Sequence, residues 1–360
     1  MKLIREEQVS ELSYNEIDPV GQVSDLSYNA IISDMILITG GTGFIGRALV
    51  RHLIDSGYAV RTLLRPSPRT PRLPKGVPVE VAVVGLGDVR GLRAALRDVE
   101  TVIHLAGTEH RGRNADLLGT DIQGTQNLAQ AAKQAGVERF VYLSHIGAER
   151  ASAFPVFKAK GIADEHIRKS GVPYTIVRSS IVYGPEDHFT TALASLLRRA
   201  PFFFPMPADG QTRIQPLWVE DLVTCLLWAM ENPDTIHKTY EVGGSEYFTV
   251  RQTLERIMEV TGKRRLLVSM SLPFLRALVV TLETFLPRFP ASSFWVDYYA
   301  VHRTCPVDNL PRTFGLMPAR FTYRLDYLVQ KPWYKLWWQN LANVTTRLSS
   351  RIQDLFRPTR

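Results

Sequence analysis

The 360-residue sequence is poor in cysteine and lacks a long uninterrupted apolar run. Its two cysteines, Cys225 and Cys305, are too few for a disulfide framework or a cysteine-rich metal centre, and they indicate a reducing compartment. The most apolar stretch, residues 272–287, is interrupted by an arginine and a glutamate and is too short to span a bilayer. Residues 1–34 contain no apolar core of a secretory signal. We therefore expect the protein in the cytoplasm.

Clusters of metal-ligating residues and nucleic-acid-binding signatures are also missing. The eight histidines are scattered, and no pair of them stands at ligand spacing with cysteine or carboxylate residues, so we predict no metal site. The net charge of +8 suits a phosphorylated cofactor, anionic lipid or nucleic acid. No nucleic-acid-binding module is visible, so we expect no nucleic-acid partner.

The most informative segment that is present spans residues 35–49. A β-branched run enters a glycine-rich turn, and a helical pattern leaves it. Gly40 permits a tight turn, Gly43 lets the backbone approach a phosphate, and Gly46 lets the helix pack close to the strand. Such a turn presents backbone N–H groups and the positive end of a helix to a pyrophosphate. The segment predicts a dinucleotide-binding site.

Strand and helix patterns alternate after this turn, and the strands are short and apolar without alternation. This rhythm predicts an α/β fold with a doubly wound parallel sheet, the Rossmann architecture, in which both faces of the sheet are covered. The expected strands cover residues 36–39, 59–64, 79–84, 101–105, 140–144 and 174–177, and the expected helices cover 45–56, 89–96, 120–135 and 159–169.

We divide the chain into four parts. Residues 1–34 are polar, acidic and carry a short repeat, so we expect a disordered leader. Met35 directly precedes the first strand, and we interpret the leader as an appendage that arises from the assigned start codon. Residues 35–185 form the nucleotide-binding domain, residues 186–330 a smaller C-terminal lobe interleaved with its sheet, and residues 331–360 a separate tail.

The pattern in the C-terminal lobe is less regular. The proline-rich residues 201–207 predict a loop. Helices are expected over residues 219–230, 249–260 and 272–285, and a strand over 240–242.

The end of the second strand bears on the choice of cofactor. An NAD-preferring site usually places an acidic residue there for the ribose 2′-hydroxyl, but here Arg65 occupies the position, followed by Arg69, Arg72 and Lys75. A guanidinium suits a 2′-phosphate, which favours NADP(H). NAD(H) stays open, because a solvated basic loop explains the same residues.

Several motifs occur in the order and spacing of one known family between residues 36 and 330. The motifs are Gly40-Gly-Thr-Gly-Phe-Ile-Gly46, His104-Leu-Ala-Gly107, Gly124-Thr125 with Asn127, Val141-Tyr-Leu-Ser144, Val177-Arg178-Ser-Ser-Ile-Val-Tyr-Gly-Pro185, Val219-Glu-Asp221 and Tyr240-Glu-Val-Gly-Gly244. By these motifs the chain resembles the extended and atypical short-chain dehydrogenases/reductases, which bind NAD(P), and most of all the branch with the nucleotide-binding accessory subunit of respiratory complex I.

The resemblance implies which residues contact the cofactor. Leu86 stands where family members often place an aspartate for the adenine, although Asp88 is the equivalent if the loop shifts. Ser144 is implied near the nicotinamide, and His104 is implied to be structural. The implied contacts, with Arg65, Leu86 and Ser144, come from Gly40, Thr42, Gly43, Phe44, Ile45, Gly46, Leu105, Ala106, Gly107 and Lys160.

The chain departs from the family at the catalytic helix. The family's Tyr-x-x-x-Lys motif places a tyrosine one turn before a lysine, on one helix face. If the lysine is Lys160 the tyrosine position holds Val156, and if it is Lys158 that position holds Phe154. Neither alignment gives a phenol, so the usual proton transfer is absent.

The remaining catalytic candidates are Ser144, Lys160 and His145. His145 follows Ser144 directly, and a histidine titrates in the range that proton transfer needs. A structural side chain at the end of a strand is the favoured interpretation of His145. Tyr183 is assigned to a structural Tyr-Gly-Pro turn.

Residues 331–360 predict a basic amphipathic tail helix with tryptophans. It is expected either to lie on the cytoplasmic face of a membrane or to pack on its own domain or a partner subunit. One face carries Trp337, Leu341, Val344, Leu348, Ile352 and Leu355.

Three functions remain open from the sequence. The first is an NAD(P)H-binding structural or redox-sensing protein without tyrosine-dependent catalysis, linked to a membrane quinone or respiratory complex. The second is an active reductase, epimerase or dehydratase that acts on a lipid-like or sugar-nucleotide substrate. The third is a membrane-anchored assembly factor. Whether the protein is an enzyme is therefore left open.

Overall fold

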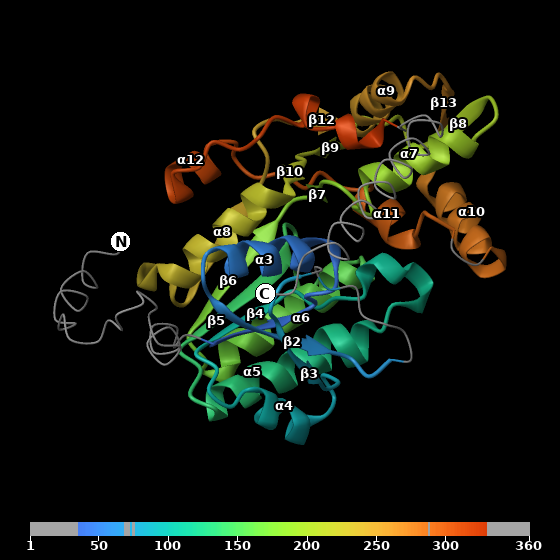
Figure 1. Ribbon diagram of the computed structural model, residues 1–360. Coiled ribbons are helices and arrows are strands. Elements are labelled where there is room, and N and C mark those ends of the chain that lie inside the picture. Colours follow the sequence, from blue (N-terminus) through green and yellow to red (C-terminus); the bar gives the residue numbers. More distant parts are fainter. Residues whose placement is uncertain (1–34, 68–72, 74–75, 287–288, 330–360) are drawn as a thin grey trace, which may run out of the picture.

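A computed structural model describes residues 35–67, 73, 76–286 and 289–329. The predictions for the leader at residues 1–34 and for the tail at residues 331–360 lie outside the described residues. The described chain forms a sheet with helices on both faces, and a smaller lobe lies above the carboxyl ends of the strands (Figure 1).

The sheet has seven strands, all parallel, in the order β11-β6-β5-β4-β1-β2-β3. The chain runs outward in one direction from β1 to β3 and in the other from β4, so the order reverses between β1 and β4. The predicted doubly wound parallel fold is confirmed. The strands are β1 (Met35–Thr39), β2 (Ala59–Leu64), β3 (Glu80–Val83), β4 (Thr101–His104), β5 (Arg139–His145), β6 (Tyr174–Ser179) and β11 (Lys238–Val242).

Two helical layers bury the two faces of this sheet (Figure 1). The helices α3 (Phe44–Asp55) and α8 (Val219–Glu231) cover one face, while α4 (Val89–Ala95), α5 (Thr125–Gln134) and α6 (Pro155–Ser170) cover the other. Side chains of β1 alternate between these layers: Ile36 and Ile38 pack with α3 and α8, and Leu37 packs with α4 and α5. Burial on both faces explains the continuous apolar runs in the sequence.

The helix expected over residues 120–135 has two parts. A π-helical segment, η2 (Leu117–Gly124), precedes α5. The side chain of Asp116 accepts a hydrogen bond from the Gly119 backbone N–H at 2.9 Å, so the segment is capped four residues before the predicted helix start at residue 120. π-Helical turns inside helices often occur at functional sites. This segment carries Asp121 to the carboxyl end of the sheet.

The lobe contains five further helices and three pairs of short strands. The helices are α7 (Thr190–Arg199), α9 (Val250–Thr261), α10 (Leu272–Phe285), α11 (Ser293–Tyr298) and α12 (Asn309–Phe314). The strands are β7 (Val182–Tyr183), β8 (Phe203–Pro207), β9 (Arg213–Ile214), β10 (Leu217–Trp218), β12 (Phe248–Thr249) and β13 (Leu266–Met270). The 3₁₀ turns are η1 (Glu109–Asn114), η3 (Pro233–Thr235), η4 (Phe321–Tyr323) and η5 (Asp326–Leu328).

The prediction of a loop over residues 201–207 is wrong. Most of that segment is β8, which pairs in parallel with β13. Phe204 and Met206 alternate into the core of the lobe, and this alternation identifies the strand. The sheet has only two strands, so a proline can face the unpaired edge without breaking the ladder.

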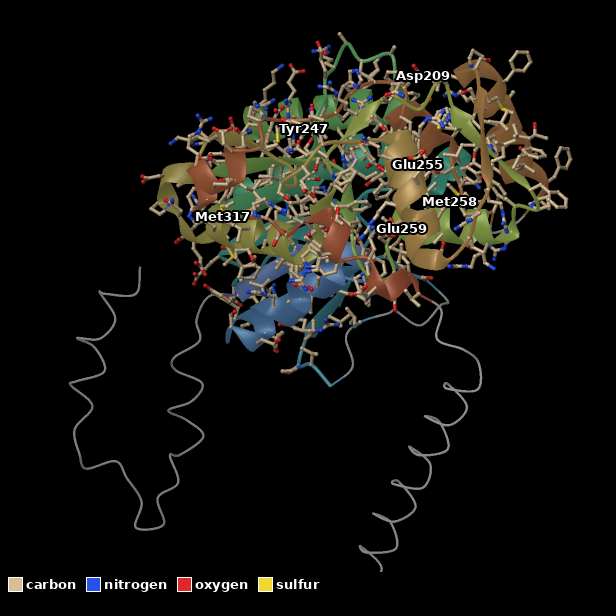
Figure 2. The ribbon with its side chains drawn as sticks, turned by 90° about the horizontal axis from the view of Figure 1, so that it is seen from above. Asp209, Tyr247, Glu255, Met258, Glu259 and Met317 are labelled. Carbon is tan, nitrogen blue, oxygen red and sulfur yellow. The ribbon has the colours of Figure 1, made fainter. Side chains whose placement is uncertain are left out.

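Other boundaries in the lobe follow the sequence closely. The helix α10 covers the predicted residues, and α9 begins with a capping box at Thr249 and ends at Gly262, whose φ is +65°. In Figure 2, Glu255, Met258 and Glu259 of α9 lie on the outer side of the lobe. Within the described residues, no helix combines the length and the apolarity that crossing a membrane requires.

Candidate functional site

A cavity of about 750 Å³ opens at the carboxyl edge of the sheet, where the strand order reverses. In open α/β sheets, ligands bind at this switch point. The cavity lies between the β1–α3 turn, the ends of β4 and β5, helix α6 and the lobe helix α11. The predicted site residues that line it are Gly40, Thr42, Gly43, Phe44, Ile45, Gly46, Leu105, Gly107, His145 and Lys160.

The β1–α3 turn requires glycine for steric reasons. Gly40 has a φ of +78°, which other residues rarely adopt. The N–H of Gly43 donates to the carbonyl oxygen of Gly40 at 2.9 Å and closes the turn. A Cβ atom at Gly46 would lie 2.1 Å from the same carbonyl oxygen, so no side chain fits there. The turn therefore brings bare backbone to the wall of the cavity.

The start of α3 provides the features of an anion-binding site. Its first turn lines the cavity and carries no acidic residue, and the first N–H groups of a helix have no partner within the helix. Arg47 also lines the cavity, where its guanidinium donates to the Thr42 carbonyl oxygen at 3.1 Å and pairs with Glu186 at 2.7 Å. Arg47 was not predicted as a site residue, although it follows the glycine-rich turn directly.

Four predicted cofactor contacts do not line this cavity. Ala106 lies between two lining residues, and its N–H donates to Thr39 Oγ1 at 3.3 Å. Arg65 is exposed just after β2, and the other predicted basic residues of that loop, Arg69, Arg72 and Lys75, lie outside the described residues. Leu86 follows β3 and is half-buried. Ser144 is buried within β5.

In the loop after β3, Leu86 and Asp88 make different contacts. Leu86 packs against the core layer beneath α4 and α5, and its carbonyl oxygen accepts a hydrogen bond from Asn127 at 3.1 Å. The side chain of Asp88 accepts from the Gly91 N–H at 2.9 Å and so caps α4. Asp88 therefore has a structural role in the described fold.

His104 joins three elements below the cavity. It is fully buried, with Nδ1 2.5 Å from Thr39 Oγ1 and Nε2 2.9 Å from Thr125 Oγ1. Burial, with a smaller contribution from the nearby Lys160, lowers the pKa of His104 to about 3. The imidazole therefore stays neutral at physiological pH and connects β4 to β1 and α5, which is a structural role.

The two candidate lysines of α6, Lys158 and Lys160, lie in opposite environments. Lys160 is buried and lines the cavity, whereas Lys158 is exposed. Only Lys160 therefore occupies the place of an active-site lysine. Val156 lies one helical turn before it and is buried among apolar side chains of the lobe. The structure therefore places no phenol on this helix face next to Lys160.

Two carboxylates that the sequence analysis missed surround Lys160. The ammonium group lies 3.8 Å from Asp121 Oδ1, and both side chains are buried. Glu109, at the start of η1, lines the same cavity and lies 3.6 Å from His145 Nε2. The sequence could have pointed to Glu109, because this residue follows the His104-Leu-Ala-Gly107 motif after a single residue. Asp121 depends on the π-helical turn, which the sequence pattern did not predict.

Burial and mutual charge interactions shift the pKa values of Lys160, Glu109 and Asp121. Burial alone would lower the pKa of Lys160, but Tyr142, Glu109 and Asp121 outweigh burial and raise that pKa above its usual value. Burial raises the pKa of Glu109, but Lys160 and His145 outweigh it and hold that pKa well below its usual range. Burial, opposed by Lys160, raises the pKa of Asp121 to about 6. Lys160 and Glu109 therefore form a fixed charge pair across the site.

Several buried polar atoms around the cavity have no hydrogen-bond partner among the described residues. Such atoms are rare in native interiors and indicate a missing polar ligand or water. The atoms are Glu109 Oε2, Asp121 Oδ1, Tyr142 Oη, Ser144 Oγ and His145 Nδ1. Of these residues, Glu109 and His145 line the cavity, and the other three do not. Glu109 and His145, with the ammonium group of Lys160, therefore offer the cavity polar groups that can bind a ribose or a carboxamide.

Ser144 and His145 occupy opposite faces of β5. Side chains alternate along a strand, so Ser144 shares with Tyr142 the face that packs against α6. His145 faces the cavity and touches the aromatic rings of Phe157 and Phe294. No group of three or more histidine, cysteine or carboxylate side chains in the described part of the chain is placed to hold a metal ion.

Two family models match the chain. A model described as NAD(P)H-binding matches residues 40–193, and one described as the NAD dependent epimerase/dehydratase family matches residues 157–243. Together they cover the glycine-rich turn, the residues Glu109, Asp121 and Lys160, and the strands of the sheet that follow β1.

Curated relatives include subunits of a respiratory enzyme and a lipid reductase. The chain is 27% identical over 259 residues to the mitochondrial NADH dehydrogenase [ubiquinone] 1 alpha subcomplex subunit 9 of Arabidopsis thaliana, covering 70% of this chain and 64% of that protein. It is 32% identical over 200 residues to the ceramide reductase of Caulobacter vibrioides, covering 55% of this chain and 62% of that protein.

Solved structures confirm the fold. A nucleoside-diphosphate-sugar epimerase from Staphylococcus aureus superimposes with a TM-score of 0.64 at 20% identity, over 81% of this chain and 99% of that one. The UDP-glucose 4-epimerase of Thermus thermophilus, solved with NAD, gives a TM-score of 0.61 at 22% identity, over 82% and 97%.

Proposed function

The chain belongs to the NAD(P)-binding, epimerase/dehydratase-like family of Rossmann proteins, and from that premise we propose that it holds NAD(P)H without the family's tyrosine-dependent catalysis. One observation carries this proposal: buried Val156 stands one helical turn before Lys160, where the proton-transferring phenol would be needed. General acid–base catalysis contributes roughly a hundred- to ten-thousandfold to such reactions. A bound nucleotide would therefore persist in its reduced form.

The chain's residues have separate tasks in this proposal. The glycine-rich turn and the first turn of α3 bind the pyrophosphate, with Arg47 beside them. Lys160, which lines the cavity, holds the ribose at the nicotinamide end. When bound, the nucleotide supplies a transferable hydride. Glu109 fixes the position of Lys160 by charge, and the protein acts as a structural or redox-sensing nucleotide carrier.

The relatives support a respiratory setting for this role. Mitochondrial NADH dehydrogenase subunits from several organisms, among them Arabidopsis thaliana and Rattus norvegicus, match about 70% of the chain. We therefore extend the proposal to a peripheral position on a membrane-bound respiratory complex. The predicted tail helix, which would provide the membrane contact, lies outside the described residues.

The absence of turnover can be tested directly. We expect the purified full chain to bind NADPH, seen as enhanced nucleotide fluorescence, and to oxidise none of it above background across a panel of aldehydes, ketones, quinones and sugar nucleotides. The reason is that Val156 leaves the family's tyrosine position, one helical turn before Lys160, without a phenol. Turnover that disappears in His145→Ala would overturn this part of the proposal.

A second candidate function rests on the His145–Glu109 pair. In a carbonyl reduction the developing alkoxide needs a proton, and the imidazole of His145 faces the cavity with a carboxylate 3.6 Å away. Glu109 stays ionised beside it. This arrangement supports a reductase with histidine as its proton donor. The carbonyl panel with His145→Ala distinguishes it from the first proposal.

We also propose that the cofactor preference is for NADP(H), through Arg65. We expect Arg65→Glu to shift the ratio of NADPH to NADH affinities toward NADH by at least about tenfold, since a hydrogen bond between charged groups contributes roughly 1.5–3 kcal/mol. The measurement is a pair of fluorescence titrations. Arg51→Glu, at an exposed position of α3, makes the same charge change away from the strand end and is the control. Equal shifts in both variants would contradict a specific contact at Arg65.

A further inference from the structure

A second cavity lies in the C-terminal lobe, and the proposed function gives it no role. Its volume is about 520 Å³, and it lies between α7, β8, α10 and α11. Three residues, His188, Phe189 and Trp295, line both this cavity and the cavity at the carboxyl edge of the sheet, which we call the nucleotide cavity. The two cavities therefore meet at these residues. Both volumes lie in the range of small-molecule sites.

The shape and chemistry of the second cavity point to a linear apolar ligand. Its wall follows α7 from His188 to Ala200, which at 1.5 Å of rise per residue is roughly 15 Å or more. The walls between these ends are almost entirely apolar, with Leu193, Leu196 and Leu282 among the aliphatic side chains and Phe204 among the aromatic ones. His188 lines this cavity at the junction with the first cavity, and Arg199 lines it at the end of α7.

The cavity is bordered by exposed apolar side chains on the outer surface of the lobe. Leu278 lines the cavity and is also 38% exposed, so the cavity reaches the surface at α10. Phe274 lies one turn before it and Phe285 at the end of the same helix, exposed by 74% and 75%. Phe202, just before β8, and Phe203, its first residue, are exposed as well, and α10 and β8 lie at one end of the molecule (Figure 1). Gathered apolar rings of this kind mark a contact surface with lipid or protein.

We propose that the second cavity binds the hydrocarbon chain of a membrane amphiphile, whose polar end enters the nucleotide cavity past His188. The exposed rings of α10 and β8 rest on the bilayer from which the chain is taken, and the apolar walls replace the bilayer around it. The proposal deepens the proposed function by naming the class of molecule that meets the nucleotide. The proposal depends on NAD(P)H binding only where it places the polar end of the amphiphile next to the nucleotide.

Calorimetric titration of the full chain with fatty acids of 8, 12 and 16 carbons tests the cavity. We expect affinity to rise by up to about fourfold for each added methylene, since burial of a methylene contributes that factor, until the cavity is filled. Ala192→Phe, which fills the cavity from α7, should weaken binding of the 16-carbon acid at least about tenfold. Ala277→Phe, an exposed position of α10, is the matched control and should change it by less than about twofold.

The outcomes separate this proposal from nucleotide binding. NADPH binding is titrated in parallel by fluorescence. The NADPH affinity should be the same in Ala192→Phe and Ala277→Phe. Equal affinity for 8- and 16-carbon acids, or equal affinity of the two variants for the 16-carbon acid, would overturn the cavity proposal whether or not NADPH binds. If Ala192→Phe does not fold, Leu196→Gln, which places an amide among the apolar walls, takes its place with the same expectation.

A second measurement tests the membrane as the source. We expect the doubly substituted Phe274→Ser, Phe285→Ser chain to take up a fluorescent 16-carbon acid from phosphatidylcholine vesicles at least about fivefold more slowly than the unmodified chain. Its affinity for the same acid added from water should be unchanged, because neither ring lines the cavity. Equal uptake rates would show that the chain enters from solution and would overturn the membrane source.

Discussion

Gly46→Ala is expected to weaken NADPH binding by a factor of about a hundred or more. The added Cβ would lie 2.1 Å from the Gly40 carbonyl oxygen and 2.7 Å from the Gly41 Cα, and both neighbours are backbone. The turn must therefore open, which moves the N–H groups of α3 away from the pyrophosphate. Hydrogen bonds to a charged group contribute roughly 1.5–3 kcal/mol each, so the loss of two accounts for the expected factor.

The measurement is a fluorescence titration with NADPH alongside thermal unfolding. Gly136→Ala is the matched control, because Gly136 has a φ of +75° and precedes β5 at the opposite edge of the sheet. That substitution costs about 1–2 kcal/mol of stability through backbone strain. It should leave the NADPH affinity unchanged. A comparable loss of affinity in both variants would mean that general destabilisation, and not the phosphate turn, is responsible.

The sheet could be predicted from sequence because its strands are buried on both faces. The strand over residues 59–64 has the predicted bounds, and β1 and β4 differ from their predictions by a single residue. Continuous β-branched runs between glycine-rich turns leave little choice of register. The strand β8 was missed because prolines usually exclude a central strand, whereas in a two-stranded sheet they can occupy the free edge.

The candidate site was predictable only where one short segment defines it. The glycine-rich turn is local, so its place at the cavity follows from the sequence. The choice between Lys158 and Lys160 needed a longer pattern, and the ion pair of Asp164 with Arg178 at 2.7 Å shows how α6 is set against β6. Glu109 and Asp121 reach Lys160 from η1 and from a π-helical turn, and no periodicity predicts contacts between such segments.

The two sides of the nucleotide cavity use different groups to bind a ligand. The phosphate side uses backbone groups, which any sequence with the right glycines can present. The nicotinamide side uses buried charges whose protonation depends on one another. Loss of the tyrosine leaves this charge group intact, which fits a site kept for holding a ligand.

Lys160→Met is expected to destabilise the fold by about 3–5 kcal/mol at pH 7.5. The substitution keeps the volume of the side chain but removes the ammonium group 3.8 Å from Asp121. Glu109 and Asp121 would then remain buried without their cation, and breaking a buried ion pair from one side has a cost of this size. Chemical unfolding of the full chain measures the loss. Lys158→Met, two residues away and exposed, should change stability by less than about 0.5 kcal/mol.

The loss should also depend on pH in a defined direction. Without the ammonium, burial raises the pKa of both carboxyl groups above the values of about 4 that they have in the unfolded chain. The folded variant then binds protons that the unfolded variant has released, so its stability rises as the pH falls from 7.5 to 5. The unmodified chain holds Glu109 ionised throughout this range and lacks that gain from Glu109. A deficit of Lys160→Met relative to the unmodified chain that is the same at both pH values would contradict the electrostatic role of Lys160 and indicate a packing defect.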